Sequence, residues 1–200
     1  MLEARDLECE RGGRKLFGGL SLSLAPGELL RVAGPNGSGK TSLLRILCGL
    51  LTPTRGEVRW KGEAVAKLRE EFSRDLLYLG HAPAVKDDLT PRENLEIACR
   101  LAGLSPAKAA LAEALAALSV PERQVRRLSQ GQRRRSALAR LILSAGVPLW
   151  LLDEPFAALD TSAAALLEGL LTEHVAQGGA VVYTTHQATG LDAAARVLGL

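Results

Sequence analysis

The sequence is poor in cysteine and in long apolar runs. Its three cysteines, Cys9, Cys48 and Cys99, lie far apart along the chain. This spacing excludes a disulfide scaffold and gives no CxxC zinc motif, so we interpret the cysteines as reduced, buried thiols. The longest apolar run, residues 141–152, is too short for the roughly 20 residues that cross a bilayer. If the protein acts at a membrane, another chain must supply the membrane-spanning part.

Neither sign of charge dominates the sequence. Lysines and arginines number 25 and acidic residues 22, which leaves a net charge of +3. So small an excess does not by itself predict nucleic-acid binding. Seven arginines fall within residues 123–140, and the simplest interpretation of this cluster is a solvated, salt-bridged helix face. With 200 residues, 47% of them hydrophobic, the chain can form one domain with a sizeable core.

Strands and helices alternate along most of the chain. Apolar patterns predict strands at residues 2–10, 20–24, 28–33, 57–60, 76–79, 148–152 and 180–185. They predict helices after Lys40, from Gly131 to about residue 143, and over residues 163–177. This order indicates an α/β fold with a mainly parallel sheet. The first two strands are expected to form an antiparallel β subdomain.

Residues 86–131 have a different character, because they are rich in alanine and leucine and contain no predicted strand. Thr90, Pro91 and Glu93 form a typical helix start, with a capping residue, a proline at the first position and an acid three residues on. We expect a helical lobe here, inserted in a core made of residues 1–85 and 132–200. Together the two parts would form a single domain over residues 1–200.

The segment after the predicted strand 28–33 fits the phosphate-loop pattern GxxxxGK[ST]. Its residues are Gly34, Pro35, Asn36, Gly37, Ser38, Gly39, Lys40 and Thr41. Glycines let successive N–H groups point inward toward an anion, and the following helix adds the positive end of its dipole. Lys40 should reach the β- and γ-phosphates of a nucleotide, and Thr41 should ligate Mg²⁺. The loop follows a strand and opens a helix, which argues against an ordinary glycine-rich turn.

Two carboxylates, Asp153 and Glu154, follow the apolar strand 148–152. If this strand and the strand before the phosphate loop are parallel neighbours, Asp153 faces the loop, where it would hold Mg²⁺ directly or through water. Glu154 would then polarise the attacking water as a general base. The alternative is that the pair only begins a helix or turn.

Residues 128–132, with the sequence LSQGQ, precede an arginine-rich helix that Ser129 can cap. Placed between the phosphate loop and the acidic pair, they resemble the LSGGQ signature of ABC-type ATPases, and the likeness in motif order covers essentially the whole chain. The resemblance implies an ATP hydrolase that uses ATP and Mg²⁺. It also implies a pairing with a second copy of the chain, in which Ser129, Gly131 and Gln132 contact the ATP of the partner chain. The helical lobe would dock a polytopic membrane permease, which would place the protein peripherally on the cytoplasmic face of the cell membrane.

The same resemblance assigns further residues. His186 looks like the switch histidine that contacts the γ-phosphate. The usual adenine-stacking aromatic residue is absent, and Arg11 stands near its position, with Phe17 as the other candidate. The usual glutamine of the Q-loop is replaced by His81, whose ring could bind the metal or a water in its place. His174 has no partner motif, and we interpret it as a surface residue.

Three runs narrow the resemblance: Leu16-Phe17, residues 77–81 (LYLGH) and residues 150–156 (WLLDEPF). Together with Cys9-Glu10-Arg11, they are similar to the ATP-binding subunits of the cytochrome c maturation, or haem exporter, system. This implies a CcmB-like permease as the partner and no nucleic acid. The alternatives are a subunit of another ABC transporter, or a soluble ABC ATPase that binds nucleic acid through residues 123–140. A kinase or GTPase would leave residues 128–132 and His186 as coincidences.

Overall fold

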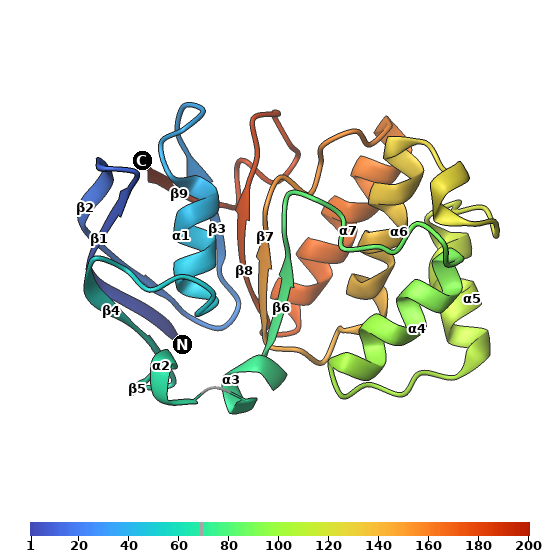
Figure 1. The fold of residues 1–200 in the computed structure, drawn as a ribbon, viewed down its shortest axis with the longest axis horizontal. Coiled ribbons are helices and arrows are strands. Elements are labelled where there is room, and N and C mark those ends of the chain that lie inside the picture. The colour runs from blue at the N-terminus through green and yellow to red at the C-terminus, as the bar shows by residue number, and fades with distance from the viewer. Residues whose placement is uncertain (69) are drawn as a thin grey trace.

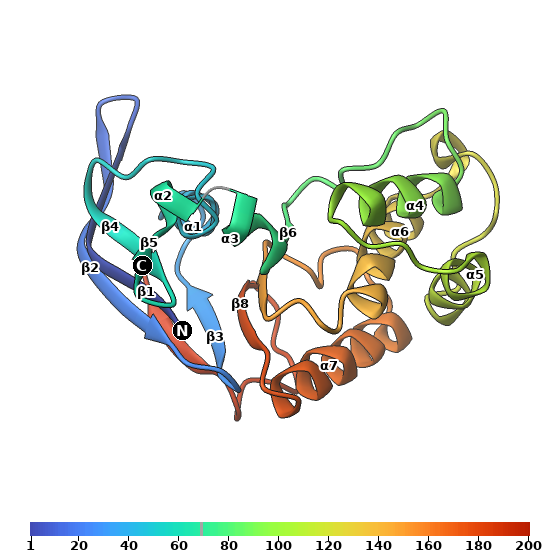
Figure 2. The same ribbon diagram turned by 90° about the horizontal axis from the view of Figure 1, so that it is seen from below.

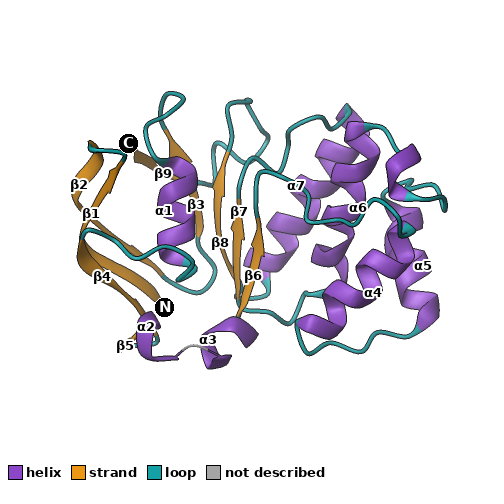
Figure 3. Cartoon of the chain, in the orientation of Figure 1, coloured by secondary structure: helices purple, strands orange, loops and turns teal. Residues whose placement is uncertain are grey.

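A computed structural model describes residues 1–68 and 70–200, and its strands form two sheets (Figures 1 and 3). The first sheet is antiparallel and contains β1 (Leu2–Arg11), β2 (Arg14–Leu24), β4 (Arg55–Trp60) and β5 (Glu63–Ala64). The second is parallel and contains β3 (Leu29–Ala33), β6 (Leu76–Leu79), β7 (Leu149–Leu152), β8 (Ala180–Thr184) and β9 (Arg196–Gly199). Its strand order is β6-β7-β8-β3-β9. The predicted α/β fold with an N-terminal antiparallel subdomain is confirmed.

The helices fall into two groups. Beside the first sheet lie α1 (Lys40–Leu47), α2 (Val65–Leu68) and α3 (Glu70–Arg74). The larger group contains α4 (Pro91–Leu101), α5 (Lys108–Ala117), the 3₁₀ helix η1 (Val125–Arg127), α6 (Gln130–Leu143) and α7 (Thr161–Ala176). The predicted cap of α4 is confirmed, because Thr90 and Glu93 form a reciprocal capping box. Of the described helices, none is both long and apolar enough to cross a membrane.

The parallel sheet separates two hydrophobic cores (Figure 2). Successive residues of a strand point to opposite faces, and β7 shows this directly. Its Leu149 and Leu151 join the core under α1 and the antiparallel sheet, whereas Trp150 and Leu152 join the core under α4–α7. All four residues are buried, as the lack of polar alternation in this strand predicted.

Some elements escaped the sequence analysis. The edge strand β9 is mostly exposed and has no apolar run, and β5, α2 and α3 are only two to five residues long. The expected lobe boundary at residue 131 falls inside α6, which packs against α4 and α5 of the lobe and also against α7 and β6. This helix therefore joins the lobe to the core.

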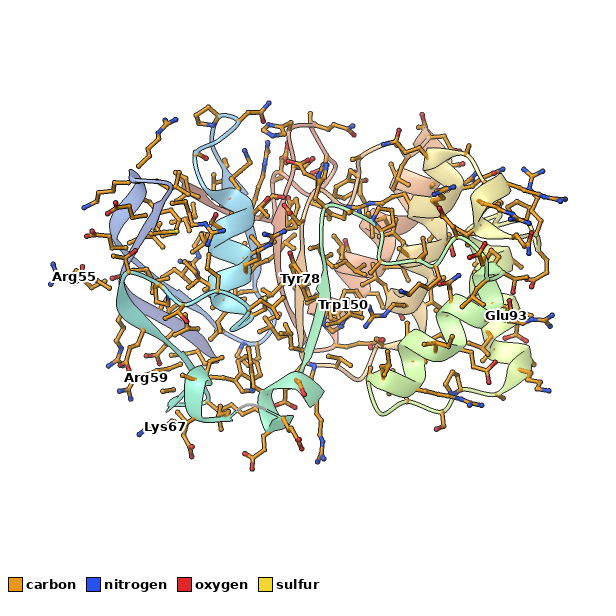
Figure 4. The ribbon with its side chains drawn as sticks, in the orientation of Figure 1. Arg55, Arg59, Lys67, Tyr78, Glu93 and Trp150 are labelled. Carbon is orange, nitrogen blue, oxygen red and sulfur yellow. The ribbon has the colours of Figure 1, made fainter. Side chains whose placement is uncertain are left out.

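The interpretation of His174 as a surface residue is wrong. Its side chain is only 3% exposed, and its ring stacks on Trp150 with the ring centroids 3.8 Å apart (Figure 4 labels Trp150). His174 follows the buried Leu167 and Leu171 at helical spacing, so it belongs to the apolar face of α7. Burial lowers the pKa of His174 and favours its neutral form.

Candidate active site

A pocket of about 790 Å³ opens at the carboxyl ends of the parallel strands. Most of the residues that line it come from the segments after four of the five strands. Lys40 follows β3, His81 follows β6, Asp153 and Glu154 follow β7, and His186 follows β8. Because parallel strands end at the same edge of a sheet, segments far apart in the sequence meet at this pocket.

The phosphate loop is held in a curled shape by its own lysine. The Lys40 side chain is 7% exposed, and its Nζ donates hydrogen bonds to the carbonyls of Gly34 and Pro35 at 2.9 and 3.0 Å. Gly39 is the N-cap of α1 with φ of 108°, and a Cβ there would lie 3.0 Å from the ring of Phe17. No side chain of the described residues caps α1, so the N–H groups of its first turn are available to an anion.

The carboxylate of Asp153 is buried, at 1% exposure, between two hydroxyl groups. Its Oδ2 accepts a hydrogen bond from Thr41 Oγ1 at 2.8 Å, and its Oδ1 accepts one from Thr184 Oγ1 at 2.9 Å. Asp153 therefore faces the phosphate loop and does not merely begin a turn. Strands β7 and β3 are parallel but are not the neighbours that the prediction for Asp153 had required: β8 lies between them, and its Thr184 completes the contact.

The donor set around Asp153 suits a hard divalent cation. A carboxylate and a hydroxyl lie together at the phosphate loop, and Mg²⁺ typically combines one or two such ligands with phosphate oxygens and water. Within residues 1–68 and 70–200, no group of three or more His, Cys, Asp or Glu side chains could hold a metal alone. A nucleotide and water would therefore have to complete the coordination.

Glu154 has its backbone held from two sides. It adopts a left-handed conformation with φ of 50°, its N–H donates to Thr184 Oγ1 at 2.8 Å, and its carbonyl accepts from Arg134 Nη2 at 2.5 Å. Its Oε1 lies 3.2 Å from His186 Nε2, but this buried oxygen makes no hydrogen bond to any described residue. Such an unpaired acceptor beside a pocket is suited to bind a water or a substrate hydroxyl.

The outer part of the pocket contains Arg11, as expected, together with Leu16, to which the sequence analysis gave no role in the site. Phe17, the other candidate for adenine stacking, instead packs against Gly39 and the core on the α1 side. Arg11 is exposed at the turn between β1 and β2, so its guanidinium can lie over a planar base. Which residue stacks on adenine stays a prediction.

The signature residues lie outside this pocket. Ser129 is the N-cap of α6, as expected from its sequence position, and forms a capping box with Gln132. Gln132 N donates to Ser129 Oγ at 3.2 Å, and Ser129 N donates to Gln132 Oε1 at 3.0 Å. Gly131 packs so closely that a Cβ would lie 2.7 Å from the carbonyl oxygen of Ala158. The structure thus leaves Ser129, Gly131 and Gln132 out of the pocket that the phosphate loop lines.

Arg134 and Thr184 are site residues that the sequence analysis missed. Arg134 belongs to the arginine cluster interpreted as a solvated helix face, but its side chain is buried, with the residue 4% exposed. It lies at helical spacing from the buried Leu138 and Leu141, and this periodicity could have revealed it. Desolvation lowers the pKa of Arg134, and the carboxylates of Asp153 and Glu154 oppose that shift.

Comparisons with known proteins agree with this geometry. Residues 17–157 match the profile of the ABC transporter family. The cytochrome c biogenesis ATP-binding export proteins CcmA of Aromatoleum aromaticum and Nitrosomonas europaea are 56% and 52% identical over 190 residues. Each alignment covers 94% of this chain and 89% of the relative. The dimeric structure of a bacterial ABC transporter cassette is similar with a TM-score of 0.85 and 25% identity, over 100% of this chain and 94% of that one.

Proposed function

Because this chain belongs to the ABC transporter family and is the ATP-binding and ATP-hydrolysing subunit of a transporter, we propose that it drives the export step of cytochrome c biogenesis. The observation that supports ATP hydrolysis best is the buried Thr41–Asp153 contact beside Glu154, whose buried Oε1 makes no hydrogen bond to a described residue. The cytochrome c assignment is supported by relatives of that name, which align over nearly the whole chain. The step driven would be haem export or the release of haem from a chaperone.

Each residue of the pocket has a separate role in hydrolysis. The phosphate loop Gly34–Thr41 binds the phosphates, and Lys40 exchanges its loop carbonyls for β- and γ-phosphate oxygens. Thr41 and Asp153 hold Mg²⁺, which neutralises charge on the phosphates. Glu154 orients and polarises the attacking water. His186 and His81 approach the γ-phosphate from the segments after β8 and β6.

A second copy of the chain would complete each ATP site. Ser129, Gly131 and Gln132 lie at the N-terminus of α6, a position that suits phosphate binding, yet they do not line the pocket of their own chain. In a head-to-tail dimer, the start of α6 of one chain would cover the phosphate loop of the other. The dimeric cassette of similar fold supports this arrangement.

The membrane partner would be a polytopic, CcmB-like permease, and the protein would lie peripherally at the cytoplasmic face of the membrane. A second cavity of about 460 Å³ lies between α1 and α6, beside Tyr78, which Figure 4 labels. It is lined by Arg45 from α1 and Arg140 from α6, together with the loop that contains His81. A partner segment in this cavity would contact the core and α6, the helix that packs against α4 and α5 of the lobe, and this supports docking there.

The proposal is tested by Glu154→Gln, with Glu113→Gln on the exposed face of α5 as the matched control. Loss of a general base should lower hydrolysis by about 10²–10⁴-fold, while binding of a fluorescent ATP analogue persists. The Glu113 variant should hydrolyse ATP like the unchanged protein. Unchanged hydrolysis in the Glu154 variant would overturn the assigned chemistry.

The same variant tests the transport assignment, because slow hydrolysis prolongs the ATP-bound state. Tagged Glu154→Gln protein would be purified from detergent-solubilised membranes of its host, and the co-purifying chains identified by mass spectrometry. Recovery of a polytopic permease with cytochrome c biogenesis proteins supports the proposal. An unrelated permease would overturn the cytochrome c assignment alone, and nucleic acid in the eluate without a membrane protein would overturn the transporter assignment.

A further inference from the structure

Within residues 1–68 and 70–200, Arg134 is the one side chain whose guanidinium donates hydrogen bonds both to the loop after β6 and to the end of β7. We infer that it is a positioning residue for ATP hydrolysis: it ties the backbone of Glu154 to the His81 loop and links both to the helix that begins with the signature segment. This inference rests on the proposed role of Glu154 as the general base.

The guanidinium of Arg134 donates to four backbone carbonyls. Nη1 donates to the carbonyls of Gly80 and His81, both at 3.0 Å. Nη2 donates to the carbonyls of Asp153 and Glu154, at 2.7 and 2.5 Å. A planar guanidinium suits this task, because its donors lie in a fixed fork and serve two acceptors on each side.

These contacts begin where the sheet ends. The parallel pairing of β6 and β7 finishes at Leu79 and Leu152, and the last backbone bond runs from Asp153 N to the carbonyl of Leu79 at 2.8 Å. Beyond this point the two chain segments turn into the pocket. Beyond the last backbone hydrogen bond between β6 and β7, the side chain of Arg134 connects the two segments. It therefore determines how the His81 loop and Glu154 lie relative to each other.

The conformation of Glu154 shows why such a restraint is needed. A residue other than glycine at φ of 50° is strained and persists only when its surroundings hold it. Thr184 Oγ1 holds the N–H of Glu154, and Arg134 holds its carbonyl. The two contacts fix the peptide units on both sides of the residue and thereby the direction of its carboxylate.

The burial of a cation here has no simpler explanation in packing. Arg134 forms no ion pair with a described carboxylate. Its Nε also has no hydrogen-bond partner among the described residues. An apolar side chain would fill the same space without the desolvation that lowers the pKa of this guanidinium. The four carbonyl contacts are therefore what the charged group provides.

The position of Arg134 in α6 adds a connection to the second chain. It lies five residues after Ser129 in the same continuous helix, so a shift of the helix start moves the guanidinium with it. In the proposed dimer, ATP held against Ser129 would thus influence Glu154 of that same chain, which serves the other ATP site. Arg134 offers a physical route for coupling the two sites.

The first test compares Arg134→Lys with Arg133→Lys, its neighbour on the exposed side of α6. Lysine keeps the charge but cannot serve both carbonyl pairs, so kcat for ATP should fall by about 10–100-fold, with KM changed less than about twofold. Rates are expressed per nucleotide bound at saturation, which removes any loss of folded protein. Arg133 pairs with the exposed Asp87 at 2.7 Å, and its variant should keep the unchanged kcat.

A double-mutant cycle distinguishes positioning from general damage. In a Glu154→Gln background, Arg134→Lys should lower the residual single-turnover rate by less than about threefold, because the group that it positions is already gone. The same fold loss in both backgrounds, or an unchanged kcat in the single variant, overturns the inference. If Glu154→Gln itself leaves hydrolysis unchanged, the proposed function fails instead.

A second variant and readout cover the case in which the lysine protein folds poorly. Arg134→Gln keeps two donors on a shorter stem, which reaches one carbonyl pair at most. Amide hydrogen exchange should then accelerate in residues 80–84 and 153–157 together, while α1 and β3 stay as protected as in the Arg133→Lys control. Exchange that rises uniformly, or in neither segment, overturns the inference.

Discussion

Helices α1 and α6 both begin at segments that contact a nucleotide in the proposed dimer, but the two starts are built differently. The start of α1 has glycine at its N-cap and no side-chain cap among the described residues, and the buried Lys40 is bonded to carbonyls of the same loop. The start of α6 has a complete capping box, in which Ser129 and Gln132 satisfy each other. The backbone N–H groups at the start of α1 therefore have no side-chain acceptor in the part of the chain that the structure describes, whereas those at the start of α6 are partly paired by Ser129 and Gln132.

This difference indicates how the binding work is shared. At α1, free N–H groups, Lys40 and the Thr41–Asp153 pair all lie in one chain, so a single chain can bind nucleotide there. At α6, the Ser129 hydroxyl accepts from Gln132 N but keeps its own proton to donate. We therefore expect α1 to determine affinity for ATP, and α6 to act only when a second chain brings a phosphate to it.

The largest expected effect comes from Lys40→Ala, which removes the phosphate-loop lysine at the uncapped start of α1. It removes the one cation of the phosphate loop, so hydrolysis should fall by about 10²–10³-fold or more and the affinity for ATP should drop with it. Titration with a fluorescent ATP analogue and steady-state phosphate release measure the two effects. Arg45→Gln, one turn later in α1 and exposed, is the matched control. Tight ATP binding by the alanine variant would contradict the comparison.

Mixing two inactive variants tests whether the two starts act on the same ATP from different chains. Lys40→Ala protein and Ser129→Phe protein should each be nearly inactive. In a random mixture, about half of the dimers contain one chain of each variant. Each mixed dimer has one intact ATP site, formed by Lys40 of one chain and Ser129 of the other. About a quarter of the hydrolysis rate of the unchanged protein should therefore return. Phosphate release by the mixture measures this recovery. Absence of recovery, in a mixture shown to exchange chains, would place both starts in one chain.

A smaller effect is expected from Ser129→Ala, compared with Thr90→Ala in the capping box of α4. Each change removes an N-cap, so each should lower the free energy of unfolding by about 1 kcal/mol. Only Ser129→Ala should also lower hydrolysis, by about tenfold, through the lost phosphate contact. Urea unfolding and phosphate release separate stability from activity. Equal losses of hydrolysis in the two variants would make Ser129 a cap and nothing more.

The smallest effect concerns the face of the sheet that carries α6 and α7, where the buried His174 lies. Because burial lowers its pKa, the folded protein resists protonation that the unfolded chain accepts below about pH 6.5. Acid should therefore destabilise the fold by at most about 1.4 kcal/mol per pH unit below that point. His174→Phe should flatten the pH dependence of urea unfolding, and the exposed His81→Gln should not. Parallel stability curves for the protein and His174→Phe would contradict this assignment.

Short-range patterns identified most of the fold and of the pocket. The strands that are buried on both faces, the capping box at Thr90, the N-cap at Ser129 and the phosphate loop all depend on neighbours along the chain. Such features are readable because helix and strand periods and cap chemistry act over a few residues. The exposed edge strand β9 lacked any such pattern and was not predicted.

The contacts that join distant segments could not be read in this way. That Asp153 meets Thr41 although β8 separates their strands, and that Arg134 reaches four carbonyls near residues 80 and 154, depend on the order of strands in the sheet. The burial of His174 against Trp150 likewise depends on which face of α7 the sheet covers.

By itself, the sequence determined which chemical groups this protein has and the local structures that present them. Local backbone geometry and capping make those assignments, since they involve residues only a few positions apart. The tertiary structure alone decided which groups meet. Packing two cores on opposite faces of one parallel sheet brings together residues more than a hundred positions apart, as in the bond between Thr41 and Asp153. The motifs pointed to the approach of Asp153 to the phosphate loop, but the bond across β8 is set by the folding of the whole sheet.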